Sequence, residues 1–335
     1  MPTQCLNLSL YWITTLTFLF LACKKDPDPQ IEQETWEQVT GLLSPMGMAK
    51  DTKGRIWITE GGTGNNDARL SFVTLDGQKV VSLSGLPSVI ANGAVEGISR
   101  PYIKGELLLF AHGISGKVYK LKKNLTSLAD NQLTFTLSDF DVLDLNAFAR
   151  ALPTSIDSNT NVMDLHVDDK GDLYILDAGA NVLIKSEKAT NNFSVFAEFP
   201  KIPNEAPFPV SQDPVPTGLS FDGSKFLVSA LSGVPFAPGK AKIFTVSTSG
   251  QVTEYKSNFT TLIDIELDAN SQPTVLSYAT FSLESGFAPN SGTISDSNGN
   301  ILLNGLNQPS AILRKEGNVY YVLSYGDGTL KKYTL

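Results

Sequence analysis

The chain has 335 residues, of which 41% are hydrophobic and 18% are charged, a composition typical of a soluble globular protein. The formal net charge of −8 argues against a nucleic-acid partner, because phosphate binding needs a concentrated basic surface. Both cysteines, Cys5 and Cys23, lie near the N-terminus. The rest of the chain therefore has no disulfide framework, cysteine nucleophile or thiolate metal site.

The N-terminal segment has the pattern of an export signal. The apolar run from Leu6 to Ala22 has the length of a secretory core and is short for a membrane span. It ends in Phe20-Leu-Ala-Cys23, which resembles the lipobox of bacterial lipoproteins, and the charged, proline-rich residues 24–30 resemble a surface-export tether. We therefore predict a lipoprotein signal peptide over residues 1–22, lipidation of Cys23 and a tether over 23–34. The expected location is the outer membrane of the bacterial cell envelope; the alternative is an uncleaved anchor helix.

About six copies of one pattern follow the tether. In its clearest forms, residues 45–60 and 161–177, an alternating apolar strand leads through an Asp/Gly turn into a second apolar strand. Repeats of about 40–50 residues built from strands indicate a β-propeller. The first strand of each repeat carries a small or acidic marker residue: Gly47, Gly97, Asp164, Gly218, Asp264 and Ala311. We predict an all-β, six-bladed propeller with four-stranded blades over residues 35–335.

The sixth repeat ends one strand short. Residues 36–40 alternate as a strand should, so we expect this N-terminal strand to complete the last blade and close the ring.

The longest connections are predicted to share one face. Loops after the second and fourth strands of a blade emerge on the same side, which we call the decorated face. Five long segments fall at such positions: 61–67, 139–160, 199–215, 231–240 and 279–292. Residues 139–152 have helical spacing and are expected to form one short helix. Loops on a rigid scaffold commonly carry function, whereas the opposite face is expected to hold only tight turns such as Asp76-Gly77.

Acidic residues at strand ends could supply oxygen ligands for Ca²⁺ or Mg²⁺, although structural capping by the same residues is the competing interpretation. These residues are Glu60, Glu96, Asp164, Asp177 and Asp264, of which Glu60 and Asp264 are the weak metal candidates. In the six-bladed lactonase and gluconolactonase group, a Glu, an Asn and an Asp at the starts of three first strands hold a metal. Here the comparable positions read Ser44-Pro45 and Thr217, and Asp264 is one residue out of register. No other cofactor is predicted.

The candidate binding residues lie in the decorated loops and at the strand ends beside them. They combine Gly-, Asn- and Asp-rich backbone with a few aromatic rings, as small-molecule sites do. The candidates are Glu60, Asn65, Asn159, Asn161, Asp177, Asn181, Thr217, Phe236 and Phe287, and the catalytic residues are unknown. His112 and His166, the only histidines, are interpreted as structural because no triad spacing accompanies them.

Several segments resemble the ScyD/ScyE family of secreted, NHL-like propellers. They are residues 158–164, the Asp-Ala-Gly-Ala-Asn run at 177–181, Pro214-Val-Pro-Thr-Gly218, residues 231–239 and residues 259–264. The resemblance implies a six-bladed propeller outside the cytoplasm and brings no established catalytic residues. We therefore favour a lipid-anchored propeller that binds or scaffolds a small molecule, a glycan or an envelope partner. The alternative is a metal-dependent lactonase-like hydrolase or a lyase.

Overall fold

The structure, a computed structural model, describes residues 36–91, 93–204 and 210–335. The predicted signal peptide, Cys23 and the tether lie outside the described residues. In the part of the chain that is described, no helix is long and apolar enough to cross a membrane.

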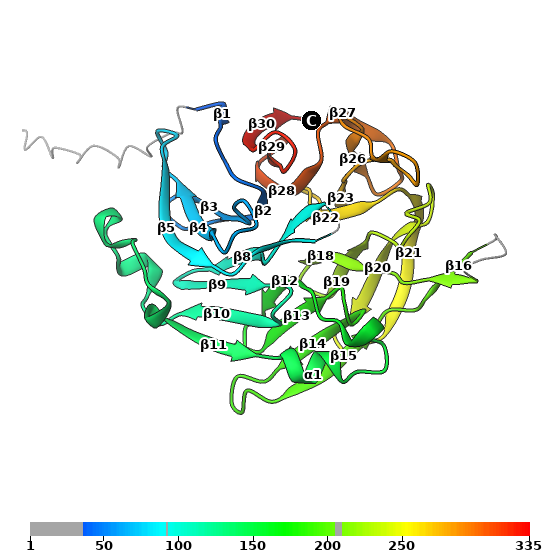
Figure 1. Cartoon of the computed structure of the whole chain (residues 1–335), viewed down its shortest axis with the longest axis horizontal. Helices are drawn as coiled ribbons and strands as arrows, with labels where there is room; N and C mark the ends of the chain where they lie inside the picture. The colour runs from blue at the N-terminus through cyan, green and yellow to red at the C-terminus, as the bar shows by residue number, and fades with distance from the viewer. Residues whose placement is uncertain (1–35, 92, 205–209) are drawn as a thin grey trace, which may run out of the picture. The chain divides into compact units, whose positions relative to one another are not determined.

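Six antiparallel four-stranded sheets stand in a ring (Figure 1), which confirms the predicted six-bladed propeller. The first strand of each blade contacts the first strands of the blades on either side, so these six strands surround the centre. Their bounds are β2 (Pro45–Lys50), β8 (Ile98–Lys104), β12 (Val162–Val167), β18 (Pro216–Phe221), β22 (Leu262–Leu267) and β28 (Pro309–Glu316).

The remaining strands of each blade follow outward in chain order. Blades 1 to 3 continue with β3 (Ile56–Glu60), β4 (Ala68–Val73) and β5 (Lys79–Leu86); β9 (Leu107–His112), β10 (Lys117–Leu121) and β11 (Phe140–Asp144); and β13 (Leu173–Asp177), β14 (Val182–Ser186) and β15 (Phe193–Glu198). Blades 4 to 6 continue with β19 (Lys225–Ala230), β20 (Ala241–Ser247) and β21 (Val252–Phe259); β23 (Pro273–Ser277), β26 (Gly292–Asp296) and β27 (Ile301–Leu306); and β29 (Val319–Ser324) and β30 (Thr329–Thr334).

Small elements fill the connections. Three two-stranded hairpins are β6 (Val89–Ala91) with β7 (Ala94–Glu96), β16 (Ile202–Pro203) with β17 (Ser211–Gln212), and β24 (Phe281–Ser282) with β25 (Gly286–Phe287). The helical pieces in the described ranges are α1 (Asn146–Arg150) and 3₁₀ turns at Leu125–Ser127, Asp130–Gln132, Leu137–Asp139 and Ile156–Ser158.

An N-terminal strand closes the ring, as predicted. The strand β1 (Gln38–Val39) pairs antiparallel with β30 and becomes the fourth strand of blade 6. Its ordered pairing covers two residues rather than the five expected, and a further backbone bond joins Lys332 to Glu37 at 3.1 Å. The last blade therefore contains both ends of the propeller domain, and its edge is covered.

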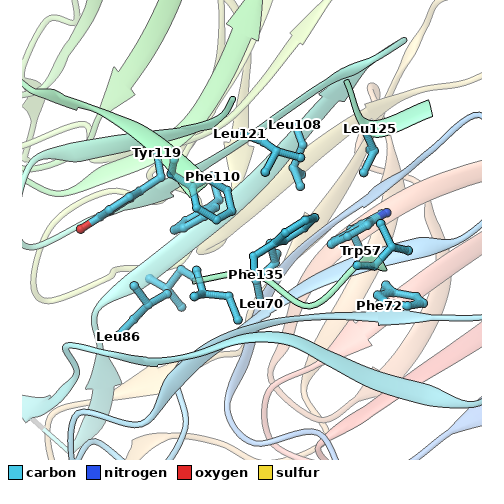
Figure 2. Close-up of a cluster of buried hydrophobic side chains, with 14 of the residues drawn as sticks. Trp57, Leu70, Phe72, Leu86, Leu108, Phe110, Tyr119, Leu121, Leu125 and Phe135 are labelled. Carbon is cyan, nitrogen blue, oxygen red and sulfur yellow. The ribbon is translucent and has the colours of Figure 1, made fainter. Parts of the chain in front are cut away.

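Hydrophobic layers between neighbouring blades form the core. Figure 2 shows the layer between blades 1 and 2, where Trp57 and Phe72 face Leu108 and Phe110. Phe135, from the segment between β10 and β11, stacks on Trp57 with ring centroids 6.4 Å apart. An insertion in blade 2 thus completes the core that it shares with blade 1.

Blade 2 differs from the sequence-based prediction. The helical spacing over 139–152 predicts one helix, but β11 occupies its first half and α1 only Asn146–Arg150. β11 pairs with β10 from Lys117–Asp144 to Leu121–Phe140, because a free sheet edge satisfies more backbone groups than a single helical turn. The long insertion, residues 122–139, therefore precedes the fourth strand and lies on the face opposite the decorated one.

We expect Trp36→Ala to lower the free energy of unfolding by about 3–4 kcal/mol, because a buried indole that anchors the closing strand is lost. Trp36 is 7% exposed and its ring lies 5.6 Å from that of Tyr321. Urea unfolding measures the change, and Thr40→Ala, at an exposed position of the same segment, is the control. If Trp36→Ala lowers the free energy of unfolding no more than the small loss expected for Thr40→Ala, the closing strand contributes little to stability.

Candidate functional site

Arg100 occupies the centre of the ring. The pairing of β8 with β9 places it at the position that Asp164 holds in blade 3, so the blade 2 marker is Arg100 and not Gly97, as the sequence predicted. Gly97 instead lies in the connection that enters the blade, with a φ of +155°.

The Arg100 guanidinium joins four blades. Its Nη1 donates to Asp164 Oδ2 at 3.2 Å and to Asp264, and its Nη2 donates to the carbonyl oxygens of Ile263 at 2.8 Å and Ser310 at 3.1 Å. Its partners come from blades 3, 5 and 6, and only 5% of the residue is exposed. Arg100 is therefore a buried cross-link at the axis of the propeller.

The two carboxylates extend this cross-link. Asp164 Oδ2 also accepts the Leu219 amide at 2.9 Å, and Asp264 Oδ2 accepts the Ile312 amide at 2.9 Å. Burial raises the pKa of Asp164 to about 6, partly opposed by Arg100 and reinforced by Asp264, and burial likewise raises the pKa of Asp264. Burial alone would lower the pKa of Arg100, but Asp264 and Asp164 hold it above its ordinary value.

Glycine at two other marker positions gives this group its space. A Cβ on Gly47 would lie 2.5 Å from Arg100 Cγ, and a Cβ on Gly218 would lie 2.9 Å from Asp264 Oδ1. The marker residues are thus complementary around the ring, with small residues where the arginine and its carboxylates need room.

Arg100 separates two cavities, because it lines both. The cavity on the decorated face has a volume of about 210 Å³. Its walls come from the starts of first strands, the loops after second strands and the β6–β7 hairpin. Most of its lining is apolar or aromatic: Met46, Met163, Leu231, Phe236, Ile263, Tyr278, Phe287 and Tyr325. The polar lining residues besides Arg100 are Glu96, Ser99, Asn161 and Ser310.

An aromatic cluster from blades 4 and 5 forms one wall. Phe236 lies 5.0 Å from Phe281 and 5.2 Å from Phe287, and Phe287 meets Tyr278 edge-on at 5.0 Å, as ring centroids. Phe236 belongs to loop 231–240 and the other rings to the β23–β26 connection. The two loops therefore hold each other in place through their side chains.

Polar groups on the opposite wall come from the β6–β7 hairpin and blade 6. The Tyr325 hydroxyl accepts the Val95 amide at 2.9 Å, which fixes the hairpin against blade 6. Burial raises the pKa of Glu96, the carboxyl next to Val95. The pKa of Tyr278 is also raised, chiefly by burial and further by Tyr325 and Glu96.

Three of the nine predicted binding residues line this cavity: Asn161, Phe236 and Phe287. Asn65 and Asn159 are exposed in their loops, away from its lining. Arg100, Tyr278 and Tyr325 could not be predicted from the sequence, because an arginine in a first strand and a tyrosine after a second strand match no known motif.

The other predicted residues have structural partners. Glu60 is fully buried and accepts hydrogen bonds from the Leu43 amide at 2.7 Å, Arg69 at 2.8 Å and the Ser71 hydroxyl at 2.6 Å. Burial raises the pKa of Glu60, but the hydrogen bonds from Arg69, Ser71 and Leu43 outweigh it and bring the pKa below the usual value.

Asp177, Asn181 and Thr217 also have structural partners, and each forms a hydrogen bond with a backbone group. Asp177 accepts the Asn161 amide at 2.9 Å, Asn181 accepts the Val215 amide at 3.1 Å, and Thr217 donates to the Leu262 carbonyl at 2.9 Å. All three residues are buried. The Asn181 and Thr217 bonds join successive blades, whereas the Asp177 bond holds the connection that enters blade 3.

No group of three His, Cys, Asp or Glu side chains placed to hold a metal ion occurs among the described residues. At the axis, Asp164 and Asp264 converge on one guanidinium. This donor set therefore fits Arg100 rather than the divalent metal of the lactonase group.

The second cavity opens on the opposite face, which was expected to hold only tight turns. It has a volume of about 300 Å³ and a more polar lining that includes Lys50, His166 and Glu266. Burial raises the pKa of Glu266 to about 7 and lowers that of His166 to about 4. The two ends of the channel therefore differ in chemistry.

Solved structures resemble this chain in fold. One is a virginiamycin B lyase from Staphylococcus aureus, with a TM-score of 0.51 and 15% identity over 89% of this chain and 99% of that one. Others are a protein of unknown function from Bacteroides thetaiotaomicron (0.54, 11% identity, 89% and 70% covered) and a putative gluconolactonase (0.52, 12% identity, 89% and 92% covered). The sequence matches no protein-family profile and no curated protein. The comparisons thus define a β-propeller and transfer no activity.

We expect Arg100→Met to lower the free energy of unfolding by about 3–5 kcal/mol at pH 8, because two buried carboxylates lose their counter-charge. The loss should be smaller at pH 4: carboxyls with a raised folded-state pKa destabilise the fold only when pH rises above their unfolded pKa. Urea unfolding at both pH values measures this. The triple variant with Asp164→Asn and Asp264→Asn should recover part of the loss, and a triple variant no more stable than Arg100→Met would contradict the explanation.

Proposed function

We propose that this protein is a lipid-anchored, extracytoplasmic binding propeller of the ScyD/ScyE type. The observation that carries the proposal is the apolar cavity on the decorated face, walled by Phe236, Phe287 and Tyr278 and closed at its floor by Arg100. A concave apolar site with a few convergent polar groups is the usual form of a small-molecule site. The ligand is a small, mainly apolar molecule, rather than a glycan or an envelope protein.

A hydrolase or lyase activity has less support. Similarity to the virginiamycin B lyase and to the putative gluconolactonase is a similarity of fold at 15% and 12% identity. Among the described residues that line the cavity, Glu96 supplies the one carboxyl and there is no histidine. Asp164 and Asp264 line the opposite cavity and are held by Arg100, and both histidines have partners away from the decorated cavity. His112 lies 2.8 Å from the Pro87 carbonyl oxygen, and the His166 ring lies 5.1 Å from that of Phe221.

The proposed anchor rests on the sequence, with its apolar run to Ala22 and the lipobox-like residues before Cys23. We expect intact-mass analysis of membrane-extracted protein to show a chain that begins at Cys23 and carries acyl groups. Cys23→Ser should abolish both the processing and the acyl mass. An unacylated wild-type chain that begins at Met1 would contradict the anchor.

Replacing residues 231–240 with a short Gly-Ser turn should remove binding while the propeller still folds, because Leu231 and Phe236 line the cavity from this loop. The probe is indole, and the reporters are the [¹³C]methyl groups of methionine. Met46 and Met163 line this cavity, whereas Met48 lines the opposite one and is an internal control.

Millimolar indole should shift the Met46 and Met163 signals of the wild-type protein and not those of the loop variant. Asp76→Ala, on an exposed turn of the opposite face, should leave the shifts unchanged. Failure of indole to shift Met46 or Met163 in the wild-type protein would contradict a binding cavity on the decorated face.

A further inference from the structure

Glu96 places one carboxyl in the decorated cavity without a protein partner. Among the described residues, four ionisable side chains line the cavity: Glu96, Arg100, Tyr278 and Tyr325. Arg100 is paired with Asp164 and Asp264, whereas no hydrogen bond or ion pair reaches the Glu96 side chain in the described part of the chain. Glu96 is half-buried, and burial raises the pKa of its carboxyl, so the carboxylate is partly desolvated without a protein donor.

Aromatic rings line the same space. Phe236, Phe287 and Tyr278 form one wall, and the Tyr325 hydroxyl is bonded to the residue next to Glu96. Glu96 and Tyr278 line the same cavity, and the charge of Glu96 contributes to the raised pKa of Tyr278. Ring faces attract cations, and a desolvated carboxylate attracts them more strongly.

We propose that the ligand of this cavity is an organic cation, an alkylammonium with an apolar body, whose charged head lies between Glu96 and the rings of Tyr278, Phe287 and Tyr325. This inference rests on the binding function proposed above and names its ligand class. The charge of the surroundings agrees: Arg100 shares its single positive charge with two carboxylates, and the whole chain has a net charge of −8. An anionic ligand would meet Glu96, and Arg100, the one cationic side chain among the described residues of the lining, is already paired.

The test compares choline with 3,3-dimethylbutan-1-ol, its neutral isostere, on the full chain in dodecyl maltoside, with the Met46 and Met163 methyl signals as reporters. Choline should bind about tenfold more tightly than the alcohol, the ratio that one desolvated cation–π and carboxylate contact supplies. Glu96→Gln should reduce this ratio to the smaller preference that the rings alone supply. Glu284→Gln is the matched control, since it removes the same charge from an exposed position on the same face.

The pH dependence of the choline affinity, compared between the wild-type protein and Glu96→Gln, is a second measurement. Choline keeps its charge at every pH, so its affinity should rise from pH 4 to pH 8 as Glu96 ionises, while that of the alcohol stays flat. Asp164 also titrates in this range, but it lies behind Arg100 and is unchanged in Glu96→Gln. A pH dependence that Glu96→Gln abolishes therefore belongs to Glu96.

The possible outcomes are distinct. Equal affinities of the wild-type protein for choline and the alcohol, or a preference for choline that Glu96→Gln leaves unchanged, would overturn the organic-cation inference and leave the binding cavity standing. If neither compound shifts Met46 or Met163 but indole does, the cation inference is again wrong and the cavity is a neutral apolar site. If indole also fails, the proposed binding function is wrong as well.

Discussion

The buried contact between Arg100 and the carboxylates of Asp164 and Asp264 is the constraint on which the rest of this propeller depends. Blades of a propeller otherwise meet through apolar layers between sheets, which set the spacing of neighbours but not of blades across the ring. Here one guanidinium bonds to blades 3, 5 and 6 at once, and its carboxylates bond to the backbone of blades 4 and 6. The centre of the ring is therefore fixed by charge and hydrogen bonds.

This arrangement makes the two ends of the molecule chemically independent. Arg100 is paired with Asp164 and Asp264, so Glu96 is the one unpaired charged side chain among the described residues that line the mainly apolar decorated cavity. The opposite cavity is polar and holds Glu266, whose pKa is about 7. The aromatic cavity on the decorated face and the polar cavity on the opposite face are thus separated along the channel by one side chain, that of Arg100.

The fold could be predicted from the sequence because its signals are local. Each hairpin has its own alternating strands and Asp/Gly turn, and the missing strand of the last blade pointed to residues 36–40. The central arginine could not be predicted, since its partners lie 64 and 164 residues away and Ser99-Arg100-Pro101 breaks the marker pattern. Glu60, an acidic residue at a strand end, looks like a metal ligand in the sequence. In the structure it is buried because Arg69 and Ser71 of the next strand donate hydrogen bonds to it, and the sequence pattern does not reveal those contacts.

The pairing of β1 with β30 has a consequence for how the protein is made. The first strand of the propeller domain to emerge from any N-terminus-first synthesis or transport is Gln38–Val39, and its partner residues, Leu330 and Lys331, emerge last. Joining the two ends of the domain is the longest-range contact in the ring, which makes it a late and slow event in folding. The ring thus stays open until residues 330–331 have been delivered. Loss of only the last few residues would leave the first blade strand without a partner.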